Sequence, residues 1–205
     1  KLIKLQKLNY KNFKFSHTYI SKIIDNIRLG LKEQNNLSLF NIRKKITLKI
    51  LHVTNFNERF NGRLHYNTGR RLNNGFIRLG HNVLTVSDRD IINKNKNIGD
   101  IYGKKSLQKV LIDSYDNFHA DCIVLGHADS VSSETLDYLK NKNKDLKVCQ
   151  WFLDPLSANG PDYQKNLKRV HDKESFMDAT FLTTSPDVLP KKIKNTHFIP
   201  NPCDQ

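Results

Sequence analysis

The sequence contains few of the residues and motifs that assign a chemistry directly. Its 205 residues include only three cysteines, Cys122, Cys149 and Cys203, which form no CxxC pair and lack the Cys/His spacing of a metal site. Cysteines used so sparingly are typical of a reducing compartment, so we expect a cytoplasmic protein. No run approaches the roughly 18 apolar residues that a membrane span needs, and the N-terminus lacks the apolar core of a signal peptide.

Acidic residues are also scarce, because 20 Asp and Glu stand against 34 Lys and Arg, a formal net charge of +14. Such a surplus is typical of nucleic-acid binding or of an anionic membrane surface, although AT-rich coding also produces it. The surplus is uneven: residues 1–46 hold 11 basic and 2 acidic residues (+9), and residues 47–205 hold 23 against 18 (+5). Basic and aromatic residues do not interleave as in RNA-binding modules, so we expect no specific nucleic-acid partner.

The composition shift places a domain boundary after Ile46 and makes residues 1–46 a basic extension. Ser16 suits a helix N-cap. Apolar residues follow it at helical spacing, namely Tyr19, Ile20, Ile23, Ile24, Ile27 and Leu31. The pattern favours a helix that packs on the main domain. A basic helix at an anionic membrane surface and a remnant of an upstream domain stay open as alternatives.

Residues 47–200 alternate between strand and helix patterns. Strands are expected at 47–54, 82–87, 121–126, 147–153, 179–184 and 196–199, and helices at 66–79, 106–117, 132–141 and 161–172. The strands 121–126 and 147–153 are nearly continuous apolar runs, which is typical of a parallel sheet covered on both faces. The sequence therefore predicts an α/β protein with a Rossmann-like, doubly wound parallel sheet. In such sheets ligands bind at the carboxyl ends of the strands, which directs attention to four loops.

The loop after the first strand contains neither GxGxxG nor GxxxxGK[ST], which disfavours a dinucleotide-binding dehydrogenase and a P-loop enzyme. It is long for an α/β connection and rich in amide and guanidinium groups, which suit hydroxyl-rich or phosphorylated ligands. Its candidate binding residues are Asn55, Arg59, Asn61, Gly62, Arg63 and Tyr66. The alternative is a solvated loop without a ligand.

Three further loops carry candidates at strand ends. His127 follows the strand 121–126 as a candidate general base, with Asp129 expected to orient its imidazole; a histidine satisfied by local backbone is the alternative. Asp154 follows the only tryptophan, Trp151, which core packing explains more simply than sugar stacking. Ser185 offers a hydroxyl or a helix N-terminus to an anion, or else a plain N-cap. No metal cluster is evident, so no metal is expected.

The run 75–86, Gly-Phe-Ile-Arg-Leu-Gly-His-Asn-Val-Leu-Thr-Val, resembles the Leu-Gly-His-x-Val signature of GT-B glycosyltransferases. The ending 198–204, Phe-Ile-Pro-Asn-Pro-Cys-Asp, is similar to the segment that closes their N-terminal domain. The stretches around Gly126-His127 and 151–155 resemble the CgeB-like, group 1-like branch. The resemblance covers residues 47–205.

This resemblance implies the acceptor-side half of an enzyme that transfers a sugar from a nucleotide-sugar donor to a glycan, lipid or protein acceptor without a bound metal. It implies that His127 lies near the sugar and that Asn201 belongs to the closing segment. Residues 201–205 would then begin a linker to a second Rossmann-like domain, without which the chain is expected to be inactive. A peripheral place at the inner membrane face is compatible with the basic extension. A non-catalytic α/β ligand-binding module and a charge-driven nucleic-acid binder remain the alternatives.

Overall fold

The computed structural model describes residues 47–189 and 192–201, and the expected basic extension and linker start at 202 lie outside them. Within these described residues lie six strands: β1 (Lys49–Thr54), β2 (Asn82–Ser87), β3 (Cys122–Gly126), β4 (Lys147–Phe152), β5 (Ala179–Leu182) and β6 (Thr196–Phe198). In the same part of the chain they are connected by five α-helices and three 3₁₀ turns: η1 (Glu58–Phe60), α2 (Thr68–Arg78), α3 (Asp88–Lys94), α4 (Lys104–Phe118), α5 (Ser133–Lys142), α6 (Tyr163–His171), η2 (Glu174–Phe176) and η3 (Pro186–Val188).

The strands form one six-stranded sheet in the order β2-β1-β3-β4-β5-β6, and every neighbouring pair is parallel. This confirms the predicted Rossmann-like, doubly wound α/β class. The chain runs outward from β1 to β2 in one direction and from β3 to β6 in the other. The carboxyl ends of β1 and β3 therefore flank the switch point of the sheet, where such folds bind their ligands.

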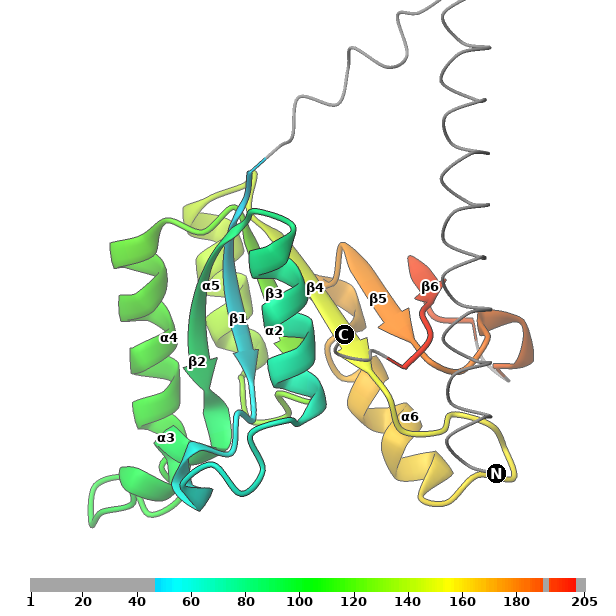
Figure 1. Cartoon of the computed structure of the whole chain (residues 1–205), viewed down its shortest axis with the longest axis horizontal. Coiled ribbons are helices and arrows are strands. Elements are labelled where there is room, and N and C mark those ends of the chain that lie inside the picture. The colour runs from blue at the N-terminus through cyan, green and yellow to red at the C-terminus, as the bar shows by residue number, and fades with distance from the viewer. Residues whose placement is uncertain (1–46, 190–191, 202–205) are drawn as a thin grey trace, which may run out of the picture. The chain divides into compact units, whose positions relative to one another are not determined.

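Helices α4 and α5 cover one face of the sheet, and α2 packs on the opposite face (Figure 1). On one face, α4 and α5 pack leucines against alternate residues of β1 and β3, and these form the largest core cluster: Leu107, Leu111, Leu136, Leu139, Leu51, Val53, Ile123 and Leu125. On the opposite face, Leu72 and Phe76 of α2 join Ile50, Val124 and Trp151. The two patterns follow from the strand period of two, because successive side chains point to opposite faces. Among the described residues no helix is long and apolar enough to cross a bilayer.

Most expected strands and helices are present with ends shifted by one or two residues, and the differences at α2 and α3 bear on the site. Helix α2 begins at Thr68 rather than Tyr66, because the side chain of Asn67 accepts a hydrogen bond from the backbone N–H of Arg70 and caps the helix there. Helix α3 was not expected and follows β2 without a loop. Asp88 and Asp90 lie in its first turn, where carboxylates interact favourably with the helix dipole.

Candidate functional site

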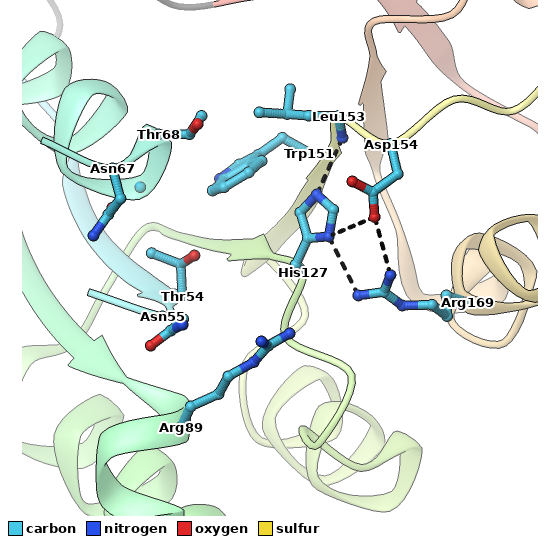
Figure 2. A pocket seen from close by; sticks show the side chains of 11 residues that line it. Thr54, Asn55, Asn67, Thr68, Arg89, His127, Trp151, Leu153, Asp154 and Arg169 are labelled. Carbon is cyan, nitrogen blue, oxygen red and sulfur yellow. Dashed lines mark hydrogen bonds and ion pairs between the residues drawn. The ribbon is translucent and has the colours of Figure 1, made fainter. Parts of the chain in front are cut away.

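A polar pocket of about 410 Å³ lies at the switch point of the sheet. The ends of β1, β3 and β4 form its floor, and the start of α2 and one side of α6 form its walls (Figure 2). Its lining comprises Thr54, Asn55, Asn67, Thr68, Gly69, Arg89, His127, Trp151, Leu153, Asp154 and Arg169. These residues come from six separate segments of the chain, which the parallel topology brings together.

The N-terminus of α2 reaches the pocket because Gly69 lets the helix approach the end of β1. A Cβ atom added at Gly69 would lie 2.6 Å from Cγ2 of Thr54, so a larger residue would push the helix away. The Thr54 hydroxyl is held in turn by the carbonyl of Gly126, at 2.8 Å. The first turn of α2 thus lines the pocket, where the positive end of its dipole lies, and its N–H groups of Arg70 and Arg71 are already bonded to Asn67.

The indole of Trp151 forms part of the pocket floor, and a buried chain of hydrogen bonds fixes its orientation. Its indole Nε1–H donates to Nε2 of His52 over 3.3 Å, which leaves Nδ1 of His52 to donate to Oδ1 of Asn73, also over 3.3 Å. Burial of His52 lowers its pKa to about 4. Gly126 lies against the indole, and a Cβ atom there would overlap the ring. The indole of Trp151 is therefore packed against Gly126 and hydrogen-bonded to a neutral His52.

His127 stands at the edge of this floor in a left-handed backbone conformation, with φ of 49°. Its Nε2 accepts a hydrogen bond from the backbone N–H of Leu153 over 3.1 Å, and its ring stacks on Phe152 at 4.3 Å between centroids. The unusual backbone thus folds the imidazole back onto β4. In the neutral ring the proton must then be on Nδ1.

Arg169, from α6, binds two carboxylates at the rim. Its Nε and Nη2 donate to Asp129 at 2.9 and 2.7 Å, and its Nη1 donates to Asp154 at 3.2 Å. Oδ2 of Asp154 lies 3.6 Å from Nδ1 of His127, and Nη2 of Arg169 lies 3.2 Å from the same nitrogen. Because a guanidinium cannot accept a hydrogen bond, the Nδ1–H is directed toward Asp154.

This network restricts the chemistry open to His127. Burial lowers its pKa, and the positive charges of Arg169 and Arg89 act in the same direction against the opposing charges of Asp154 and Asp129. Both ring nitrogens are also engaged. The imidazole is therefore a neutral hydrogen-bonding wall in this structure, and a role as general base requires the bond to Leu153 to break. Asp129 does not orient the ring as expected, because its carboxylate binds Arg169 and Asp154 takes that place.

Arg89 supplies the free positive charge of the pocket. It is exposed, it is drawn toward His127 in Figure 2, and its guanidinium makes no hydrogen bond or ion pair with the other residues that the structure describes. The guanidinium of Arg169, by contrast, is already matched by two carboxylates. With Asp129, which binds Arg169 from just outside the lining, two arginines face two aspartates, so Arg89 is the positive charge that a ligand can meet without displacing an ion pair. An anionic group is the ligand chemistry that this charge favours.

The structure brings together three of the residues that the sequence analysis singled out, since Asn55, His127 and Asp154 all line the pocket. Most of the candidates in the first loop lie outside the lining, namely Arg59, Asn61, Gly62, Arg63 and Tyr66. Arg59 instead forms an ion pair with Asp90 at 2.7 Å. That pair ties the loop to α3 and explains why the loop is long without belonging to the pocket.

The two remaining candidates are also elsewhere. The hydroxyl of Ser185 accepts a hydrogen bond from the backbone N–H of Asp187 and caps η3, which is the plain N-cap alternative. Asn201 is exposed at the end of the described range. Neither residue lines the pocket.

Several lining residues were missed. Arg89 follows the end of β2, so the strand-end rule applied to that strand would have included it. The cap signal Asn67-Thr68-Gly69 would have located the start of α2. Arg169 lies within a helix, and no sequence signal announces its place at the rim.

No three His, Cys, Asp or Glu side chains within 47–189 and 192–201 are grouped to hold a metal ion. A scan against protein-family models and a search of curated proteins find no match to this chain. The geometry of the pocket and the motifs of the sequence are therefore the features that indicate a function.

Proposed function

We propose that this chain is the acceptor-side domain of a GT-B-type glycosyltransferase and that the switch-point pocket holds the sugar-bearing ligands of that reaction. The observation that carries the proposal is the composition of the pocket. An unpaired arginine, a helix N-terminus, two amide side chains, an indole and a carboxylate meet in one cavity at the place where doubly wound sheets bind ligands. The motif order along the chain agrees with it.

Each kind of group matches one part of a phosphorylated sugar. Arg89 and the first N–H groups of α2 suit the phosphate oxygens. The amide of Asn55 keeps one N–H beside its bond to Asn57, and Oδ1 of Asn67 keeps one lone pair beside the helix cap, so each can make one hydrogen bond to a sugar hydroxyl. The indole of Trp151 adds an apolar surface for the ring. Together these groups would bind a nucleotide-sugar or a phosphorylated acceptor and orient it at the strand ends.

Asp154 is the candidate proton acceptor for the hydroxyl that attacks the sugar. It lines the pocket, its side chain is 46% exposed, and only Oδ2 bonds to Arg169, so Oδ1 is available to a ligand. Arg169 holds the carboxylate in place. His127 then contributes by orienting Asp154 through Nδ1–H, which is a positioning role.

A non-catalytic ligand-binding module is the second candidate, and the engagement of both ring nitrogens of His127 favours it. Such a module would use the same pocket and the same anionic, hydroxyl-bearing ligand. The two proposals differ only in whether the ligand is consumed.

The test is binding and turnover of uridine diphosphate glucose and guanosine diphosphate mannose, measured by calorimetry and by release of the nucleoside diphosphate with mixed glycan acceptors. We expect binding that Arg89→Ala weakens at least tenfold. The matched control Lys96→Ala removes an exposed charge outside the pocket and should bind like the parent. Release of the nucleoside diphosphate supports the glycosyltransferase proposal, and binding without release is the result that either candidate gives in the absence of the second domain. No binding of either probe rejects the pocket as the site of the sugar ligand.

A further inference from the structure

Two cysteines on neighbouring strands lie close together, away from the pocket lining. Cys122 is the first residue of β3 and Cys149 lies within β4, where Val124 and not Cys122 is its register partner. Their Sγ atoms are nevertheless 4.0 Å apart, because the two side chains lean toward each other along the same face of the sheet. Both are free thiols and half-buried, so a small reagent can reach them.

One hydrogen bond joins the two thiols. The Cys122 thiol donates to the sulfur of Cys149, and this hydrogen bond lowers the pKa of Cys149 and raises that of Cys122. The ammonium of Lys140 also favours the Cys149 thiolate, whereas the carboxylate of Asp178, which binds Lys140 at 2.9 Å, opposes it. Cys149 is therefore the thiol of the pair that loses its proton more readily and Cys122 the one that keeps it, which is the order of nucleophile and resolving thiol in reversible thiol–disulfide sites.

We propose that Cys122 and Cys149 form a redox-active thiol pair that reacts with small disulfides such as glutathione disulfide. The Cys149 thiolate attacks one sulfur of the disulfide, forms a mixed disulfide and releases one glutathione thiolate. Cys122 then loses its proton, attacks the Cys149 sulfur and releases the second glutathione thiolate. Two protein thiols are oxidised to one cross-strand disulfide, and one glutathione disulfide is reduced to two glutathiones.

The geometry allows the second step with a small movement. A disulfide bond is about 2.05 Å long, so the two sulfur atoms must approach by about 2 Å. Rotation of the two χ1 angles brings the sulfur atoms together, and the strands must also shift slightly, because diagonal neighbours in a sheet have Cα atoms about 7–8 Å apart and a disulfide usually joins Cα atoms no more than about 6.8 Å apart. Cys149 is two residues before Trp151 in β4 and on the same face of the sheet. The disulfide would therefore link β3 to β4 close to the tryptophan that lines the pocket.

The experiment uses the full chain carrying Cys203→Ser, which removes the third cysteine, and follows its intact mass in glutathione disulfide. The expected product is lighter by two hydrogen atoms and carries no glutathione, and peptide mapping should link residues 122 and 149. Adding Cys122→Ser removes the resolving thiol, so this variant should accumulate one glutathione adduct at Cys149.

Adding Cys149→Ser instead should slow the reaction at least tenfold, because the more reactive thiol is gone and burial still raises the pKa of Cys122. The proposal is overturned if the Cys203→Ser protein ends with stable glutathione adducts on both thiols or remains unreacted while Cys122→Ser is modified. It is also overturned if Cys149→Ser reacts as fast as the parent. Retention of the parent circular dichroism spectrum shows that each variant is folded.

Discussion

The two histidines that contact Trp151 differ in almost every property. His52 lies within β1, is completely buried and bonds to two uncharged partners, Trp151 and Asn73. His127 lies just beyond β3, has a side chain that is 18% exposed, and faces Arg169 and Asp154. Both pKa values are lowered by burial, but only that of His127 also responds to a charged network at the pocket rim.

The difference shows how position along a parallel strand separates architecture from binding. A residue within β1 is covered on both faces and must satisfy its polar atoms locally, as His52 does. A residue one step beyond β3 leaves the sheet at its carboxyl end, where side chains from several strands meet. Trp151 joins the two environments, because one edge of its indole bonds to His52 and its ring lines the pocket.

The largest expected effect comes from removing the shared residue. Trp151→Ala should destabilise the fold by about 3–5 kcal/mol, because it leaves a cavity and an unpaired His52. Trp151→Phe keeps most of the aromatic bulk and loses the Nε1–H bond, so we expect about 1–2 kcal/mol. Urea unfolding measures both values. Equal losses for the two variants would show that the buried hydrogen-bonded chain, rather than packing, dominates.

The buried histidine should make stability depend on pH. The pKa of His52 is about 4 in the fold against 6.5 when unfolded, so the unfolded chain binds the extra proton between these values and stability falls as pH decreases. The shift corresponds to about 3 kcal/mol in full. The stability difference between the parent and His52→Gln should shrink by about 2 kcal/mol from about pH 7 to about pH 4.5.

Comparing the two proteins cancels the opposite contribution of Asp88. Its pKa is raised to about 6 by burial, so it favours the fold as pH decreases, and it does so equally in both chains. Unfolding in urea at several pH values gives the difference. A difference that does not change with pH would mean that the pKa of His52 is the same in the folded and unfolded chain.

The ion pairs of Arg169 at the pocket rim should contribute less to stability than Trp151 does, and their charges should change the pKa of His127 rather than that of His52. Arg169→Ala should cost about 1 kcal/mol, since the guanidinium and its two aspartates are partly exposed. Because the positive charge of Arg169 lowers the pKa of His127, the variant should raise that pKa, and Arg169→Lys should raise it less. Histidine titration by NMR measures the change. An unchanged His127 in the alanine variant would contradict the coupling.

The smallest effect is expected in the first loop. Arg63→Ala removes an exposed side chain that stacks on Phe60 at 5.3 Å, so we expect less than about 0.5 kcal/mol and no loss of ligand binding. Tyr66→Ala, which removes another exposed side chain, should behave in the same way. Calorimetry with uridine diphosphate glucose checks this. A loss of ligand affinity as large as the one expected for Arg89→Ala would show that the first loop belongs to the binding site.

The sequence predicted the strands well because the buried runs, such as 121–126, have a simple pattern. It predicted part of the site because a strand end identifies His127 and Asp154 without knowledge of the neighbours. It could not predict that Arg169 reaches the rim, since that depends on how α6 packs beside β4. It also assigned Asp129 to the imidazole by proximity in sequence, whereas the left-handed backbone at His127 turns the ring toward Leu153.

The most direct measurement is a titration of uridine diphosphate glucose into the isotope-labelled chain, followed by NMR. The account predicts that the amide signals of Thr68 and Gly69 and the indole signal of Trp151 shift together in the parent and in Lys96→Ala. The same signals should not move in Arg89→Ala. Shifts confined to the first loop, or shifts at the pocket that Arg89→Ala leaves unchanged, would contradict the claim that the switch-point pocket binds the anionic sugar ligand through Arg89.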